Sequence, residues 1–136
     1  YGSEVGEPAF PYDIGCSAYL VQQVALADGS LMALAVGDRR FKILDITVEE
    51  DGLARAQIEW LTLDPIVEIP DNFTEIAASF AQCGDELTEA GSLAWRLAEA
   101  LPLSLTEQQQ LLEENDPQKR LNQVSAWLLA HPSDYI

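Results

Sequence analysis

The sequence is poor in the residues on which much protein chemistry depends. It has two cysteines, one histidine and seven basic residues among 136. One histidine and no CxxC pair disfavour a Cys/His zinc site, so we expect no metal and no cofactor. A secreted scaffold of this size normally carries a denser set of cysteines. We therefore expect Cys16 and Cys83 to be reduced, buried thiols of a cytoplasmic protein.

Positive charge is also scarce, and this limits the partners. The chain carries 23 acidic residues against 7 basic ones, a net charge of −16. Nucleic-acid binding needs clustered cations, and anionic membrane surfaces attract basic segments. The longest apolar runs, such as residues 31–36, are far shorter than the roughly 20 residues that span a bilayer. We expect neither nucleic acid nor membrane as a partner, while an apolar content of 48% is sufficient for a packed core.

The sequence also lacks recognisable catalytic patterns. A phosphate-binding loop needs Gly-Lys-Ser/Thr, but the only lysines, Lys42 and Lys119, follow Phe41 and Gln118. The single histidine precedes a proline near the C-terminus, where it is interpreted as a helix cap. Acidic runs such as residues 49–51 fall at turns and indicate a solvated surface, although weak calcium binding stays open. We expect no catalytic residues and a protein that is not an enzyme.

The pattern of apolar residues divides the chain near Pro70. Before it, strands are predicted at residues 16–27, 31–36, 41–48 and 53–61. The even-numbered residues from 18 to 26 would share one face of the first strand. Asp28-Gly29 suits a type I′ hairpin turn. Because apolar residues occupy both faces of these strands, the pattern favours a curled sheet or small barrel over residues 1–70.

After Pro70 the apolar residues recur at helical spacing. Asp71 is the predicted N-cap of the first of four short helices. Ser104 and Glu107 have the spacing of a capping box, and Asp116-Pro117 is typical of a helix start. Residues 71–136 are therefore predicted to be a helical bundle. The fold class is α+β.

Two groups of residues are candidates for binding. The run Arg39-Arg40-Phe41-Lys42 holds three of the seven bases. It is either an anion or partner site, or a set of side chains paired with nearby acids. Phe10 and Tyr12 lie in a proline-containing loop, where an aromatic side chain can contact a partner. The substrate-binding candidates are Phe10, Tyr12, Arg39 and Arg40. Core packing is expected for the three tryptophans, Trp60, Trp95 and Trp127.

Motifs in both halves, in the same order, resemble one known family. Residues 37–43 read GDRRFKI and follow the predicted hairpin, residues 93–99 read LAWRLAE, and residues 101–113 read LPLSLTEQQQLLE. DPQKRL follows at residues 116–121. Together they resemble the amino-terminal, substrate-binding domain of Lon-type ATP-dependent proteases. The helical half is similar to short, stand-alone bacterial members that lack ATPase and peptidase domains.

The resemblance implies a fold and a function. It implies a PUA-like β-barrel or pseudobarrel followed by about four short helices. Members usually open with an apolar strand and a helix before the segment similar to residues 2–6, so the barrel is expected to be incomplete at its N-terminus. The implied function is non-catalytic binding of unfolded or extended polypeptide, by a monomer or weak dimer. The alternative is a small-molecule-binding PUA-like domain with a regulatory role; RNA binding, known for other PUA-like folds, is disfavoured by the charge.

Overall fold

The computed structural model describes residues 10–130. The chain separates into two compact units, Tyr1–Leu63 and Asp64–Ile136. The division falls ahead of Pro70, because Asp64 pairs with Arg120 of the second unit. Val67 and Ile69 also pack against the core of that unit. The α+β class is confirmed, with strands in the first unit and helices in the second.

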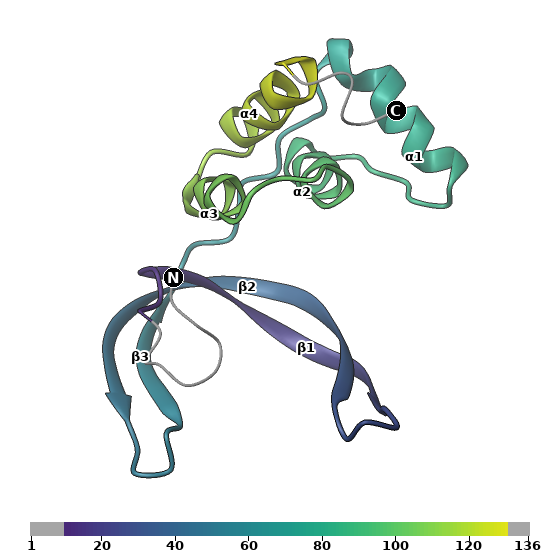
Figure 1. Ribbon diagram of the computed structural model, residues 1–136. Helices are drawn as coiled ribbons and strands as arrows, with labels where there is room; N and C mark the ends of the chain where they lie inside the picture. The colour runs from purple at the N-terminus through teal and green to yellow at the C-terminus, as the bar shows by residue number, and fades with distance from the viewer. Residues whose placement is uncertain (1–9, 131–136) are drawn as a thin grey trace. The chain divides into compact units, whose positions relative to one another are not determined.

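The first unit holds a three-stranded antiparallel sheet in the order β1-β2-β3 (Figure 1). Its strands are β1 (Ile14–Ala25), β2 (Leu31–Val48) and β3 (Ala54–Trp60). The two strands predicted at 31–36 and 41–48 are therefore one strand. Residues 37–40 stay extended because Gly37 and Arg40 pair with Ala18 and Cys16 of β1. Among the described residues the sheet is open and does not close into a barrel.

The Asp28-Gly29 turn lies where it was predicted, but its type is different. A type I′ turn needs positive φ at both central residues. Here Gly29 has φ of 85° and, within residues 10–130, no residue other than glycine has positive φ. The Gly29 N–H donates to the Leu26 carbonyl at 3.0 Å, and the Leu26 N–H to the Ser30 carbonyl at 2.8 Å. This is a three-residue loop ending in a glycine bulge, and Gly52 repeats it with φ of 85°.

Bulges break the regular alternation of the strands. The β1–β2 register shifts between Cys16 and Ala18 and again between Leu20 and Gln22. Leu20 lies opposite Ala35, and Gln22 lies opposite Leu34. Since successive residues of β2 point to opposite faces, Leu20 and Gln22 do as well. The single face predicted for the even-numbered residues of this strand is therefore wrong.

The second unit contains a 3-10 turn at Asp71–Phe73 followed by four helices: α1 (Thr74–Gln82), α2 (Ala90–Ala100), α3 (Leu105–Glu113) and α4 (Pro117–Ala130). Asp71 is not an N-cap, because it lies inside the 3-10 turn and α1 begins without a side-chain cap. The other two predicted caps are confirmed. Ser104 and Glu107 form a capping box, and the Asp116 Oδ1 accepts the Gln118 N–H at 2.9 Å.

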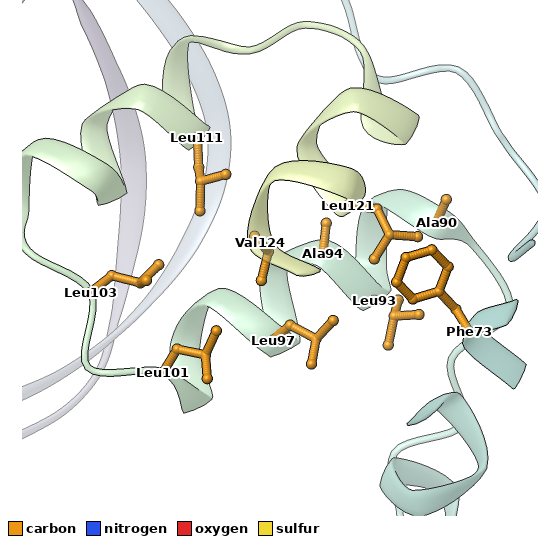
Figure 2. Close-up of a cluster of buried hydrophobic side chains, with 10 residues drawn as sticks. All are labelled: Phe73, Ala90, Leu93, Ala94, Leu97, Leu101, Leu103, Leu111, Leu121 and Val124. Carbon is orange, nitrogen blue, oxygen red and sulfur yellow. The ribbon is translucent and has the colours of Figure 1, made fainter. Parts of the chain in front are cut away.

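The core of the described chain lies in the helical unit. Figure 2 shows ten buried side chains from its 3-10 turn, helices and loops: Phe73, Ala90, Leu93, Ala94, Leu97, Leu101, Leu103, Leu111, Leu121 and Val124. None of the sheet unit's described residues, 10–63, is buried to this degree. The two cysteines are free, as expected, but both are exposed rather than buried. In the described part of the chain no helix is long and apolar enough to span a membrane.

Candidate functional site

A cluster of one arginine and two aromatic rings lies where β3 pairs with β2. Phe41 and Trp60 are cross-strand partners, and their rings meet edge to face with centroids 6.1 Å apart at 87°. The Arg39 guanidinium lies over the Trp60 ring at 5.3 Å, and its Nη2 donates to the Leu61 carbonyl at 3.3 Å. Trp60 is 46% exposed. The prediction that Trp60 packs in the core is therefore wrong.

A bulge in β2 positions Arg39. Because Cys16 pairs with Arg40 and Ala18 with Gly37, Ser17 lies opposite both Asp38 and Arg39. The Arg39 N–H donates to the Ser17 hydroxyl oxygen at 3.1 Å. The same hydroxyl donates to the Arg39 carbonyl at 3.2 Å. A bulge redirects a side chain and increases the local twist, and the serine supplies the hydrogen bonds that the ladder loses here.

A glycine makes room for the aromatic part of this cluster. The Phe41 ring covers Gly15, its cross-strand partner. A Cβ at position 15 would lie 2.7 Å from Cζ of Phe41. Glycine at this position therefore lets the ring lie against the backbone of β1 and meet Trp60 from the side.

The structure does not join all four predicted binding residues into one site. Arg40 lies between Arg39 and Phe41 on β2, so its side chain leaves the opposite face of the strand. Phe10 is 67% exposed and Tyr12 is 42% exposed. Both precede β1, where the Asp13 carbonyl accepts the Ile43 N–H at 2.7 Å. Arg39 thus belongs to a cluster with Trp60, whereas a shared site with Phe10, Tyr12 or Arg40 stays a prediction.

An apolar surface of the sheet unit lies on the hairpin of residues 18–36, which we call the arm. Figure 1 shows its two strands, β1 and the first part of β2, running together to the turn. Between Ser17 and Gly37 the only charged residue is Asp28, at the turn. Every large apolar side chain of the arm is exposed by 37% or more: Tyr19, Leu20, Val21, Val24, Leu26, Leu31, Met32, Leu34 and Val36.

One face of the arm carries most of its large side chains. Tyr19 pairs with Val36 and Val24 with Met32, and cross-strand partners share a face. Leu34 lies between Met32 and Val36 in the alternation of β2, on the same face. The nearly uncharged sequence of this stretch is the signal that points to the arm. Alternation alone does not reveal whether other residues cover a face. The exposure of the arm and of Trp60 was therefore not predicted from the sequence.

A hollow of about 480 Å³ lies between α3 and α4. Five of its seven lining residues have polar side chains: Gln110, Glu114, Lys119, Asn122 and Gln123, with Leu111 and Ala126 between them. Small-molecule sites usually have only a few convergent polar groups, so five polar side chains among seven residues are atypical of them. Within residues 10–130 no group of three or more His, Cys, Asp or Glu side chains is placed to hold a metal ion.

Two residues that do not belong to the arginine–aromatic cluster, Asp28 and Arg96, have shifted pKa values. Hydrogen bonds from the Ser30 hydroxyl and N–H hold the pKa of Asp28 below its ordinary value. Hydrogen bonds to Asp85 and Glu99 raise the pKa of Arg96 above its ordinary value. Both shifts move the pKa away from neutral pH, so neither group is suited to proton transfer there.

Sequence comparison identifies relatives over almost the whole chain. The family model of the ATP-dependent protease La (LON) substrate-binding domain matches residues 4–130. A Lon protease of Buchnera aphidicola is 27% identical over 142 aligned residues, covering 91% of this chain. One from Trichlorobacter lovleyi is 25% identical over 140, also covering 91%. The chain spans only 18% and 17% of these two relatives.

Solved structures show the same similarity. The Lon N-terminal domain protein from Xanthomonas campestris matches with a TM-score of 0.73 and 32% identity, over 86% of this chain and 69% of that one. The N-terminal domain of the Mycobacterium avium complex Lon protease matches with a TM-score of 0.64 and 23% identity. That match covers 92% of this chain and 74% of the other, and at this identity it bears on the fold alone.

Proposed function

Because the chain belongs to the Lon substrate-binding domain family, we propose that it binds unfolded or extended polypeptide and presents it to ATP-dependent proteolysis in the bacterial cytoplasm. The family's description supports substrate recognition. The whole relatives are far longer than this chain, so their proteolytic activity is not carried over to it. The proposed role of this chain is non-catalytic.

The apolar arm is the observation that carries this proposal. Folded proteins bury large apolar side chains, so an unfolded chain is the partner that offers them for contact. Exposed contiguous apolar patches mark sites of interaction, and in this chain Leu31 is 71% exposed and Met32 57%. A recognition module that accepts many sequences needs contacts that do not depend on one sequence, and apolar contact meets that requirement.

Trp60 and Arg39 offer a second kind of contact. A half-exposed indole with an arginine over its ring presents an apolar face beside a cation. We include Arg39 among the residues that contact substrate, together with Phe10, Tyr12 and Arg40 from the sequence. The small-molecule alternative is supported by the hollow between α3 and α4, but five of its seven lining residues are polar, more than a typical ligand site carries, so it is the weaker proposal.

Binding of an unfolded protein to the purified chain tests the proposal. Fluorescently labelled α-lactalbumin, reduced and alkylated so that it stays unfolded, is titrated with the chain. The native, disulfide-bonded form of the same protein is the control. We expect saturable binding of the unfolded form alone. Equal binding of both forms, or binding of neither, would contradict the proposed function.

Trp60→Ala tests whether the arginine–aromatic cluster takes part. Loss of one buried aromatic contact weakens binding by roughly tenfold when the ring contacts the partner. Leu63→Ala is the matched control, since Leu63 lies in the same unit and is 71% exposed. If both variants bind the unfolded protein as the unaltered chain does, Trp60 is not a substrate contact.

A further inference from the structure

The arm lacks what normally stabilises a β-hairpin. β3 pairs with β2 only from Phe41 to Val48, so among residues 10–130 the arm is two-stranded over residues 18–36. A two-stranded hairpin by itself is at best marginally stable in water. Here both of its faces carry exposed large side chains, for example Leu20 at 60% and Leu34 at 57%. A partner that covers these side chains would therefore stabilise the arm.

The arm also offers a free strand edge. Within residues 10–130, the stretch of β2 from Leu31 to Val36 pairs only with β1. Antiparallel pairs alternate between hydrogen-bonded and non-hydrogen-bonded positions. Leu26 and Ser30 are hydrogen-bonded, so counting along the register makes Gln23 and Ala33 a non-hydrogen-bonded pair. The N–H of Ala33 therefore points away from β1, toward a strand that is added at this edge.

The negative charge of the chain limits which polypeptide segments can bind at the edge of the arm. The chain carries a net charge of −16, yet the arm holds one charged residue, Asp28. The summed field of an acidic protein attracts cationic segments and repels anionic ones. An apolar segment with basic residues is drawn toward the chain and meets no opposing charge on the arm. A second copy of the chain has the same apolar arm but brings another −16, which opposes close approach.

Building on the proposed function, we infer that the arm binds its polypeptide as an added β-strand and selects apolar segments of net positive charge. The main-chain hydrogen bonds of strand addition do not depend on side chains. Apolar residues of the added strand project from the face that carries Met32 and Leu34 and contact these side chains of the neighbouring strand. Basic residues alternate with them and stay in water on the other face.

Two synthetic peptides test the selectivity. In the first, lysine alternates with valine and tyrosine; in the second, glutamate replaces every lysine. Binding of labelled peptide to the full chain is measured by fluorescence anisotropy at low and at raised salt. We expect the lysine peptide alone to bind, and salt to weaken its binding. Equal binding of the two peptides would overturn the selection for positive charge.

Two matched pairs of variants test the site. Leu34 and Leu44 are both 57% exposed and both lie on β2, but only Leu34 belongs to the arm. Leu34→Gln is expected to weaken binding of the lysine peptide by roughly tenfold, and Leu44→Gln to leave it within about twofold. Ala33→Pro removes the outward N–H that an added strand needs, so it is expected to abolish binding. Ala33→Thr keeps that N–H and retains binding, and circular dichroism checks that both variants fold.

The outcomes separate this inference from the proposed function. If the unaltered chain binds unfolded α-lactalbumin but Leu34→Gln and Leu44→Gln bind it equally well, the arm is not the site and the proposed function stands. If the unaltered chain binds neither that protein nor the peptides, both fail. If sedimentation shows a dimer that Leu34→Gln disrupts and that the lysine peptide does not displace, a second copy occupies the arm and the inference is overturned.

Discussion

Arg120 is the one fully buried charged side chain among residues 10–130, with 0% exposed. Its guanidinium donates to both carboxylate oxygens of Asp64, at 2.6 and 3.4 Å. It also donates to the carbonyls of Leu111, at 3.2 Å, and Glu114. The Cζ atom of Arg120 lies 4.0 Å from the Trp95 ring centroid. Every guanidinium nitrogen thus has a partner, which a buried cation requires.

Arg120→Lys keeps the positive charge but removes the planar guanidinium group with its several N–H donors. We expect it to lower the free energy of unfolding by about 1–3 kcal/mol, because a lysine cannot reach these acceptors together. Arg55→Lys is the matched control, since Arg55 pairs with Glu49 at the surface with 66% of its side chain exposed. Urea denaturation of both variants checks this. Equal midpoints for the two would contradict the structural role of Arg120.

Asp116 is a working cap and Asp71 is not. The Asp116 Oδ1 accepts the N–H groups of Gln118, at 2.9 Å, and Lys119, at 3.4 Å. Asp116→Ala is expected to destabilise the chain by about 1 kcal/mol. Asp71→Ala, in a 3-10 turn without a side-chain cap, is expected to change stability by only a few tenths of a kcal/mol. Thermal denaturation compares them, and a larger loss at Asp71 would show that the caps are assigned wrongly.

The carboxylate of Asp28 makes the arm's turn sensitive to acid. Its Oδ1 accepts the Ser30 N–H at 2.9 Å and the Ser30 hydroxyl at 2.6 Å. These bonds favour the charged form and lower the pKa of Asp28. At pH values above the ordinary pKa of an aspartate, these bonds contribute fully to the stability of the turn. The contribution is lost as pH falls through the lowered pKa of Asp28. In an NMR titration, Ser30→Ala should raise the pKa of Asp28 toward its ordinary value; an unchanged pKa would contradict this cause.

At the scale of single elements, the C-terminal end of α1 is formed by a glycine with positive φ. Gly84 has φ of 94°. Its N–H donates to the Ala81 carbonyl at 3.1 Å, and the Asp85 N–H donates to the Phe80 carbonyl at 3.1 Å. These two bonds form a Schellman motif. Gly84 therefore ends α1 in the left-handed conformation that glycine adopts without strain.

Gly84→Ala is expected to cost about 1 kcal/mol or more, because a Cβ is strained at this φ. Gly37→Ala is the control, since its added Cβ meets the Cys16 sulfur at an ordinary 3.6 Å. Chemical denaturation of both variants checks the difference. If Gly37→Ala is the more damaging, the strain at Gly84 is not what limits the substitution.

At the scale of the whole molecule, stability is unevenly distributed. The buried hydrophobic residues of the described chain all lie in Asp64–Ile136. Asp64, Val67 and Ile69 precede the helices but contact their core. A fragment of residues 64–136 is therefore expected to unfold cooperatively by itself. A fragment of residues 71–136 lacks the partner of Arg120, so we expect a lower melting temperature.

Calorimetry on the two fragments checks this expectation. It also tests the division of the chain that was predicted from sequence, at 70/71. Equal melting temperatures would show that residues 64–70 do not belong to the helical unit, in agreement with that division.

The two confirmed helix caps and the place of the Asp28-Gly29 turn were predicted from sequence because local interactions determine them, whereas the cap predicted at Asp71 and the type of that turn were wrong. The capping box at Ser104, the start of α4 at Asp116-Pro117 and the glycine turns depend on residues only a few positions apart. Hydrogen bonds between near neighbours form there in any fold that keeps the segment helical or turned. Family membership also followed from sequence, because motifs in both halves kept their order.

The sequence by itself therefore determined the α+β class, the helix boundaries set by caps and the places of the turns. Tertiary structure decided the continuity of β2, the bulges that move Leu20 and Arg39, and the exposure of Trp60 and the arm. Strand register depends on partners distant in the chain, and a shift by one residue reverses the faces. Exposure depends on what packs against a face. Alternation in the sequence therefore assigns residues to the two faces of a strand, but it does not show which face other residues bury.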